Sequence, residues 1–311
     1  MRTERYDSTH REAWNALVSR SKNGTFLFNR SYMEYHADRY QDHSLLFYDE
    51  RDRLTAILPA SQQGKELISH GGLTYGGIIC DTEMKASAML EIFDALLETL
   101  RRDGISRLMY KPVPHIFHRY PSEEDLYALY RNSARLVRRD ASSAIALPER
   151  IKFAKGKREG VRKAERHGVR IQRCMDFDGF FEIGRRIMQE KYDRQPVHTA
   201  TEIQYLQDCF PEAIQFHAAF DGPIMLAGAI TYNCNPTLHV QYMYSSPDGQ
   251  QVGALDLVLH HLLESQTGGL RYVSFGVSTE DEGRYLNEGL IHQKEMFGAR
   301  TVVHDFYELH L

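Results

Sequence analysis

Apolar and polar positions in the first part of the chain follow an order that predicts an α/β domain. Two apolar runs at 44–48 and 54–60 flank a charged turn, which predicts a β-hairpin. Residues 85–103 repeat apolar side chains at helical spacing, which predicts an amphipathic helix that Gly104 ends. The other elements predicted here are a helix at 8–20, a strand or turn and then a helix at 25–40, a glycine-interrupted strand region at 67–79 and a strand at 106–110.

The same order of elements returns in the second half, offset by roughly 165 to 172 residues. Strands are predicted at 214–220, 224–232 and 238–245, a helix at 253–267 and a strand at 271–275. We therefore expect an α/β fold with two copies of one domain, each a mixed β-sheet flanked by helices. The alternative is two unrelated α/β domains that share a common order. The predicted domains are residues 1–149 and 150–311.

Length and composition agree with two packed domains. The chain has 311 residues, 42% of them hydrophobic, and a net charge of −4, which argues against a surface that generally coats nucleic acid. Its four cysteines lie far apart, as in proteins of a reducing compartment. No secretory signal or membrane-spanning run is visible, so we expect a cytoplasmic protein with no membrane span.

A strongly basic stretch separates the two copies. Ten of the 24 residues from Arg150 to Arg173 are Lys or Arg. Lys155, Arg158 and Arg162 fall near one face of a helix. This face is either a solvated surface or a site that binds the phosphates of a nucleotide sugar, coenzyme A or an RNA acceptor stem.

The last part of the second copy has the character of a ligand-binding edge. An apolar strand at 271–275 breaks at Gly276, crosses an acidic loop and reaches Lys294-x-x-Phe297-Gly298. The first copy has no counterpart of this motif, since its strand leads into Lys111-Pro112. The asymmetry predicts that the chemistry belongs to the second copy and acceptor recognition to the first.

Together these features resemble the Fem-type branch of the GNAT acyltransferase superfamily, whose members contain two GNAT-like domains. The resemblance covers most of the chain, and Gln293 stands where the family motif has a Phe before its lysine. Fem relatives transfer amino acids from aminoacyl-tRNA to peptidoglycan precursors, and nearer GNAT-like relatives use acetyl-coenzyme A. The matching segments are Lys157-Arg158-x-x-Val161-Arg162-Lys163-Ala164-Glu165-x-x-Gly168-Val169, the helix after Gly253-Ala254, and the run from Gly283 through Gly289-Leu290 to Lys294-x-x-Phe297-Gly298.

The resemblance implies that two neighbouring strands, 238–245 and 271–275, splay apart to admit the acyl carrier. It places Phe275 and Gly276 on the wall of that cleft and the pyrophosphate of acetyl-coenzyme A at the turn before the next helix. The residues of this turn are Gln250, Gln251, Val252, Gly253 and Ala254. Gln250 and Gly253 match the family motif, whereas Leu255 stands where it has Gly or Ala.

Lys294 is implied to be catalytic, because a fixed cation stabilises charge that develops on the reacting carbonyl. The alternative is a lysine that caps the last turn of a helix starting near Leu286. Strict alternation along 238–245 places Tyr242 and Tyr244 on one face, opposite His239, Gln241 and Met243. Either tyrosine is a candidate acid and Glu280 a candidate base.

Acceptor binding is assigned to residues outside this cleft. His70 and Tyr75 lie in a glycine-rich segment of the first copy, where the glycines would allow a ligand to approach closely. The alternative is that this segment is only a structural bulge. Asn287 is a further candidate, as are the cations Lys155, Arg158 and Arg162. His115-x-x-His118 and His260-His261 lack further ligands at zinc spacing, so no metal is expected.

The favoured function is direct transfer of an acyl group, acetyl from acetyl-coenzyme A, to an amine of a sugar-linked or cell-envelope precursor. The acceptor is expected to be a small molecule or sugar nucleotide. Two alternatives stay open: an aminoacyl transferase that uses aminoacyl-tRNA, and a non-catalytic module that binds a nucleotide-linked ligand. The sequence leaves the acceptor and the oligomeric state open.

Overall fold

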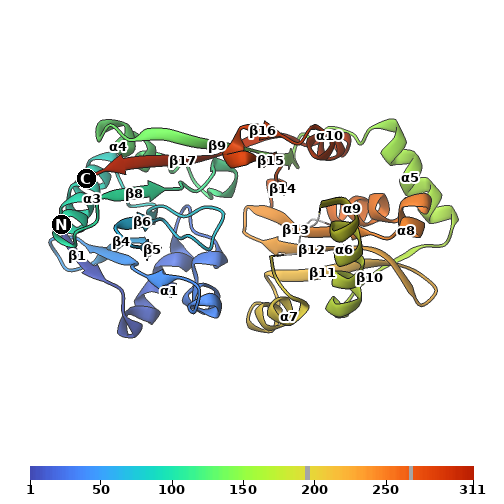
Figure 1. The fold of residues 1–311 in the computed structure, drawn as a ribbon, viewed down its shortest axis with the longest axis horizontal. Helices are drawn as coiled ribbons and strands as arrows, with labels where there is room; N and C mark the ends of the chain where they lie inside the picture. Colours follow the sequence, from blue (N-terminus) through green and yellow to red (C-terminus); the bar gives the residue numbers. More distant parts are fainter. Residues whose placement is uncertain (193–196, 266–268) are drawn as a thin grey trace. The chain divides into compact units, whose positions relative to one another are not determined.

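The computed structural model describes residues 1–192, 197–265 and 269–311, without the side chains of 36 and 188–192. The chain forms two compact units, and most of their helices and strands are labelled in Figure 1. Unit 1 contains Met1–Ala141, Thr279–Leu286 and Val302–Leu311, and unit 2 contains Ser142–Ser278 and Asn287–Thr301. The chain thus returns to unit 1 twice after it has entered unit 2. The prediction of a single division at 149/150 did not include these two returns.

Unit 1 contains two larger sheets and a two-stranded hairpin. In the first, β3 and β4 form the predicted antiparallel hairpin, with Leu45 opposite Leu58. In the second, β17 pairs antiparallel with β8, and β8 pairs parallel with β6. The first sheet has the order β1 (Arg2–Arg5), β3 (Leu45–Tyr48), β4 (Leu54–Leu58), β7 (Ile79–Cys80). The second has the order β9 (Arg135–Ala146), β17 (Arg300–His310), β8 (Arg107–Tyr110), β6 (Glu66–Ile68), β5 (Ser61–Gln63), β2 (Gln41–Asp42).

The core of unit 1 forms around α3 (Ala86–Arg102), which confirms the helix predicted at 85–103. Its apolar stripe, including Ile92, Phe93 and Leu96, is fully buried among strand residues such as Phe47 and Leu108. This burial, rather than local propensity, supplies most of the stability of such a helix. The other helices are α1 (Arg11–Arg20), α2 (Arg30–Met33) and α4 (Glu124–Arg131), with short 3₁₀ turns η1 (Ser8–His10), η2 (Phe26–Phe28), η3 (Glu34–His36) and η4 (His115–Phe117).

Unit 2 is built on one mixed sheet. All its pairs are antiparallel except β13 and β14, which are parallel. The three strands predicted between 214 and 245 and the strand predicted at 271–275 are confirmed. The order is β10 (Arg170–Arg173), β11 (Ile214–Asp221), β12 (Ile224–Asn233), β13 (Thr237–Ser245), β14 (Tyr272–Val277) and the last residues of β9.

Helices cover both faces of this sheet. Val258 and Leu262 of α9 (Ala254–Glu264) pack on one face with Val240 of β13. On the other face, Phe180 of α6 (Phe177–Tyr192) lies 4.9 Å from the ring of Tyr244, between centroids. The remaining helices are α5 (Lys155–Arg166), α7 (Ala200–Cys209), α8 (Pro247–Val252) and α10 (Glu288–Met296). β15 (Thr279–Glu280), η5 (Asp281–Gly283) and β16 (Tyr285–Leu286) form a small hairpin of unit 1.

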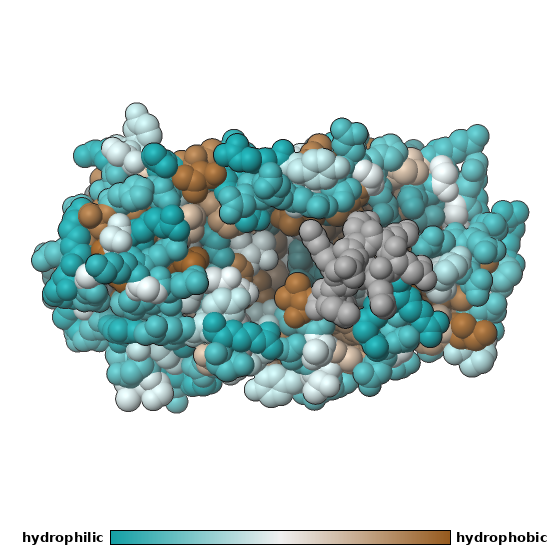
Figure 2. Space-filling view, in the orientation of Figure 1, coloured by the Kyte–Doolittle hydropathy of each residue, from teal (hydrophilic) through white to brown (hydrophobic). Residues whose placement is uncertain are grey.

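The helix predicted at 253–267 differs from the observed one at its start. α8 precedes it, and Gly253 with φ of 80° joins α8 to α9 in a left-handed conformation. Residues 266–268 of the prediction lie outside the described residues. None of the described helices is long and apolar enough to cross a membrane. The face shown in Figure 2 is mostly hydrophilic, with small separate apolar spots.

Candidate active site

β13 and β14 are paired only over a short length. Their pairing runs from Thr237 and Tyr272 to His239 and Ser274 and then stops. Beyond it, β14 pairs through Val277 with Ser142 of β9. The two strands therefore part in the middle of unit 2, at the place where the resemblance puts the acyl carrier.

A β-bulge in β13 changes which side chains share a face. Tyr242 lies opposite Ile230 and Val240 opposite Thr231, so Gln241 is an extra residue. Leu238, Val240 and Met243 all pack toward the α9 core. The predicted alternation, which put His239 on the face opposite Tyr242, is therefore wrong, because a bulge reverses the side of every later residue. His239, Tyr242 and Tyr244 share the face away from α9.

Lys294, in the last turn of α10, has a buried ammonium. It is 2% exposed, and its Nζ donates hydrogen bonds to Gly276 O at 2.9 Å, Val277 O at 2.8 Å and Ser278 Oγ at 2.7 Å. Burial lowers its pKa to about 7. Within the described residues it forms no ion pair, and these three bonds use all three N–H groups of the ammonium. Lys294 thus binds the end of β14 rather than the carbonyls of its own helix.

The rest of the Lys-x-x-Phe-Gly motif fixes the segment that leads into α5. Phe297 is fully buried, with its ring centroid 5.2 Å from that of Phe153 and Lys157 Nζ 4.5 Å above it. Gly298 has φ of 89°, and a Cβ there would lie 2.3 Å from Ile151 O. Only glycine permits this close approach.

Helix α5 lies directly on the turn predicted to bind pyrophosphate. A Cβ on Gly253 would lie 2.4 Å from Gly160 O, so the backbone of α5 covers that glycine. Lys157 Nζ pairs with Asp256 Oδ1 at 2.9 Å in the first turn of α9. Burial raises the pKa of Asp256, and Lys157 opposes the shift. Helix α5 therefore leaves no room for a phosphate on the Cβ side of Gly253.

The side chains beside the turn fit phosphate better than its glycine does. A hollow of about 880 Å³ lies between α5 and the α8–α9 turn. Gln250 and Gln251 are exposed there, whereas Val252 is half-buried and Gly253 and Ala254 are buried. Arginine, lysine and amide donors are typical ligands of pyrophosphate. The residues that line the hollow are Gly156, Glu159, Gly160, Arg162, Lys163, Glu165, Arg166, Gln250, Gln251, Gly253 and Asp256.

The other predicted cations stand on the outer surface of α5. Lys155 and Arg158 are exposed, and Lys155 Nζ lies 3.8 Å from Glu159 Oε1. Arg158 and Arg162 line a second hollow of about 320 Å³, together with Phe153. Cations of α5 therefore line both hollows, the one beside the α8–α9 turn and the one beside Phe153.

Tyr242 has a partner that the sequence pattern did not reveal. Its hydroxyl lies 2.5 Å from His198 Nδ1 and accepts from the His198 backbone N–H at 3.2 Å. His198 directly precedes Thr199, which forms a capping box with Glu202 at the start of α7. The Thr-x-x-Glu spacing was a readable signal for this helix start. Tyr244 is a packing residue by its surroundings, and burial raises its pKa to about 12.

The remaining predicted residues are spread over both units. Phe275 is buried in the core of unit 2, and Gly276, with φ of 69°, lies beside the His239 ring. Asn287 caps α10, since its side chain accepts from Leu290 N–H at 3.0 Å. Glu280 lies half-buried in β15 of unit 1.

In unit 1, His70 and Tyr75 are both buried. Tyr75 packs on Phe117 with ring centroids 4.6 Å apart. Lys111 is an unexpected parallel to Lys294, because it follows β8 and is also a buried lysine on backbone carbonyls. Its Nζ donates to His70 O at 2.7 Å and to Leu73 O, and burial lowers its pKa to about 7.

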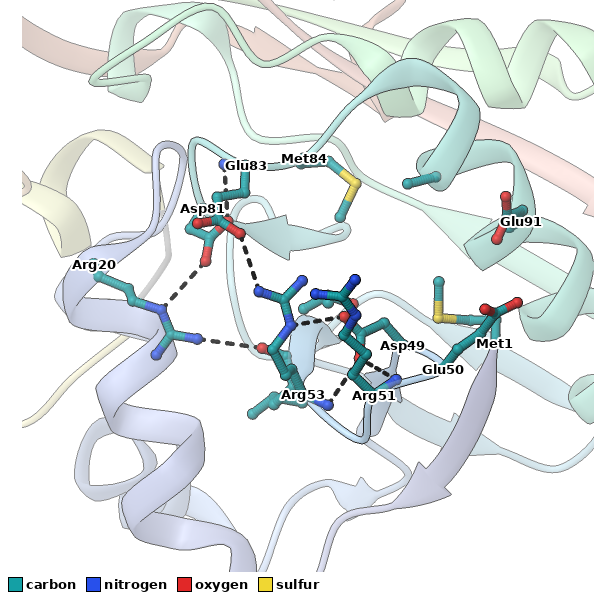
Figure 3. A pocket seen from close by; sticks show the side chains of 13 residues that line it. Met1, Arg20, Asp49, Glu50, Arg51, Arg53, Asp81, Glu83, Met84 and Glu91 are labelled. Carbon is teal, nitrogen blue, oxygen red and sulfur yellow. Dashed lines mark hydrogen bonds and ion pairs between the residues drawn. The ribbon is translucent and has the colours of Figure 1, made fainter.

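A further hollow in unit 1, of about 560 Å³, is lined by charged side chains, several of which pair with one another (Figure 3). Arg53 Nε lies 2.8 Å from Asp49 Oδ2, and Arg20 Nε lies 3.3 Å from Asp81 Oδ2. Because these charges already compensate each other, this hollow carries no functional assignment. Among the residues that the structure describes, no three His, Cys, Asp or Glu side chains gather as a metal site.

The fold is shared with FemX along the whole chain, which confirms the predicted α/β fold class and supports the resemblance at the level of the fold. FemX matches with a TM-score of 0.71 at 11% identity, over 100% of this chain and 98% of FemX. L-PGS from Bacillus licheniformis matches with a TM-score of 0.61 at 13% identity, over 99% of this chain and 93% of L-PGS. A conserved protein of unknown function from Bacteroides thetaiotaomicron matches with a TM-score of 0.66 at 10% identity, over 99% of each chain. No protein-family model matches the sequence. No curated protein matches it either. At these identities the shared property is the fold.

Proposed function

We propose that this protein is an acyltransferase whose reaction centre lies in unit 2, where β13 and β14 part. The observation that carries the proposal is the ammonium of Lys294, which is 2% exposed and has no ion-pair partner among the described residues. Burial of a charge costs free energy, and buried groups with a strongly shifted pKa are found most often at functional sites. Acyl transfer builds negative charge on the carbonyl oxygen of the donor, and a fixed cation stabilises that charge.

The hydrogen bonds of Lys294 define how it would act. All three N–H groups are bound to Gly276, Val277 and Ser278. The ammonium therefore acts through its charge in a surrounding of low dielectric constant rather than through a new hydrogen bond. It also holds the end of β14 in place.

For the donor we propose acetyl-coenzyme A, with an amine of a sugar-linked or cell-envelope precursor as acceptor, held by unit 1. Arg162, Lys163 and Arg166 face Gln250 and Gln251 across the hollow and would hold the pyrophosphate. Side chains would do this in place of the Gly253 backbone, because α5 covers that glycine.

Aminoacyl-tRNA is the second candidate donor, and the extent of the charge on α5 favours it. Exposed cations continue from Arg166 to Lys155, at the start of the helix, farther than one pyrophosphate reaches. The fold is shared with FemX, and the resemblance to the Fem branch implies aminoacyl-tRNA as the donor.

Turnover with both donors tests the proposal. Purified protein is assayed for thiol release from acetyl-coenzyme A with a panel of amino sugars, and for transfer of a labelled amino acid from charged tRNA. We expect Lys294→Ala to lower kcat about 10²- to 10³-fold with either donor. Lys65→Ala, at an exposed turn of unit 1, is the control and should keep wild-type activity. If wild type and both variants bind either donor but none of them turns it over, the chain is a non-catalytic binding module.

Salt dependence separates the two donors. Each phosphate contact that a cation neutralises adds about −0.7 to −0.9 to the slope of log K against log salt. Binding of tRNA should therefore give a steep slope that falls when Arg158 and Arg162 are replaced by Ala. Coenzyme A should give a shallow slope that responds to Arg162→Ala and not to Arg158→Ala.

A further inference from the structure

The face shared by Tyr242 and Tyr244 carries a histidine that belongs to neither strand of the cleft. The phenolic oxygen of Tyr242 accepts the backbone N–H of His198 at 3.2 Å, which leaves its own O–H to reach Nδ1 at 2.5 Å. In the neutral tautomer with the proton on Nε2, Nδ1 is an acceptor. The hydroxyl is thus polarised from both sides.

The surroundings hold this pair in one geometry. His198 is 7% exposed, and its backbone is fixed by the capping box at the start of α7. The ring of Phe181 packs on Tyr242 with centroids 5.2 Å apart. The bulge at Gln241 turns Tyr242 to this face. A strand without that bulge would direct Tyr242 into the α9 core, so three separate features bring Tyr242 to His198.

We propose that Tyr242 and His198 form the proton relay of the transfer reaction, an inference that rests on the proposed acyltransferase function. Tyr242 is the residue that exchanges a proton with the substrates, and His198 is the positioning residue that takes up the phenolic proton. Tyr242, and not Tyr244, is assigned this role because the His198 contacts at 2.5 and 3.2 Å are made to the hydroxyl of Tyr242.

The proton balance of the relay closes without a further reactant. As the nitrogen of the acceptor amine forms its bond to the donor carbonyl carbon, its proton passes to the oxygen of Tyr242. The phenolic proton passes at the same time to Nδ1 of His198, which becomes an imidazolium. When the bond from the carbonyl carbon to the leaving sulfur or oxygen breaks, Tyr242 gives a proton to the leaving group and recovers one from His198. Both residues end neutral, as they began.

Four variants test the relay in the full-length protein: Tyr242→Phe, His198→Gln, His198→Ala and the control Tyr205→Phe, on the exposed surface of α7. Glutamine can still accept a hydrogen bond from Tyr242 but cannot take up a proton. We expect Tyr242→Phe and His198→Gln each to lower kcat about 10²- to 10⁴-fold with KM nearly unchanged, and Tyr205→Phe to behave as wild type. Thermal unfolding of each variant reports whether it is folded.

Chemical rescue distinguishes proton transfer from mere support. Substituted imidazoles should restore the activity of His198→Ala, with rates that increase with the basicity of the imidazole. Wild-type kcat in His198→Gln, or rescue that is independent of basicity, would reduce His198 to a packing residue and overturn the relay. If Lys294→Ala is inactive while Tyr242→Phe stays active, the relay fails and the acyltransferase proposal stands. No turnover by wild type with any donor overturns both.

Discussion

Lys294 and Lys111 should make the stability of the protein rise with pH. Both side chains are buried, with residues 2% and 6% exposed, and burial lowers the pKa of each from 10.5 to about 7. Between these values the unfolded chain keeps the proton and the folded chain does not. The contribution of these two lysines to stability is therefore lowest below pH 7, where both states are charged, and rises as pH passes from about 7 toward 10.5.

The size of the effect follows from the two pKa values. From pH 7 to pH 9, each lysine should add about 2 kcal/mol to the free energy of unfolding. The assay is denaturant unfolding at both pH values of wild type, Lys111→Met, Lys294→Met and the double variant. Each single variant should lose about half of the rise, and the double variant nearly all of it.

The chain offers a probe for one of the two units. Trp14 is the only tryptophan and is fully buried in unit 1, so its fluorescence follows the unit that contains Lys111. Lys155→Met, at an exposed position of α5, is the control and should leave the rise unchanged. A full rise in the double variant, or a wild-type stability that falls over this range, would refute the reasoning.

Three further predictions concern packing and buried charge. Burial raises the pKa of Asp125 from 3.8 to about 6, so stability present below pH 4 should be lost as pH rises through 6. This loss amounts to up to about 3 kcal/mol of unfolding free energy between pH 4 and pH 7. Asp125→Asn should abolish it, as measured by chemical denaturation at the two pH values. Gly253→Ala should lower Tm more than Gly168→Ala in calorimetry, because both have positive φ but only a Cβ at 253 meets backbone, at Gly160. Phe297→Ala should cost about 3 to 5 kcal/mol in chemical denaturation, and a smaller loss would contradict its full burial.

The elements that could be predicted from the sequence are those whose signal is local. The apolar stripe of α3 and the strands β11, β12 and β13 carry their own periodicity, and each was found close to its observed bounds. β17 was not predicted. It carries charged residues along its length, and its partner β8 lies far back in the chain, so no local pattern marks the pairing.

The residues of the candidate site likewise differ in whether the sequence carries a local signal for them. Lys294 and Tyr242 could be nominated from the sequence, because one lies in a motif and the other on an apolar strand. His198 was missed, since a single histidine in a polar loop has no periodicity. Its relation to Tyr242 depends on the bulge at Gln241, which ordinary alternation along β13 conceals. Sequence patterns give the side of a strand only while the register is unbroken.

The place of β17 between β9 and β8 constrains how the protein can be made by the ribosome. A strand inside the sheet of unit 1 is supplied by residues 302–310, after the chain has built unit 2. Until those residues emerge, β8 keeps an open edge, and such edges are sites of aggregation during synthesis. Completion of unit 1 must therefore wait for unit 2, and a truncated fragment that ends at Ala141 should not fold as an independent domain.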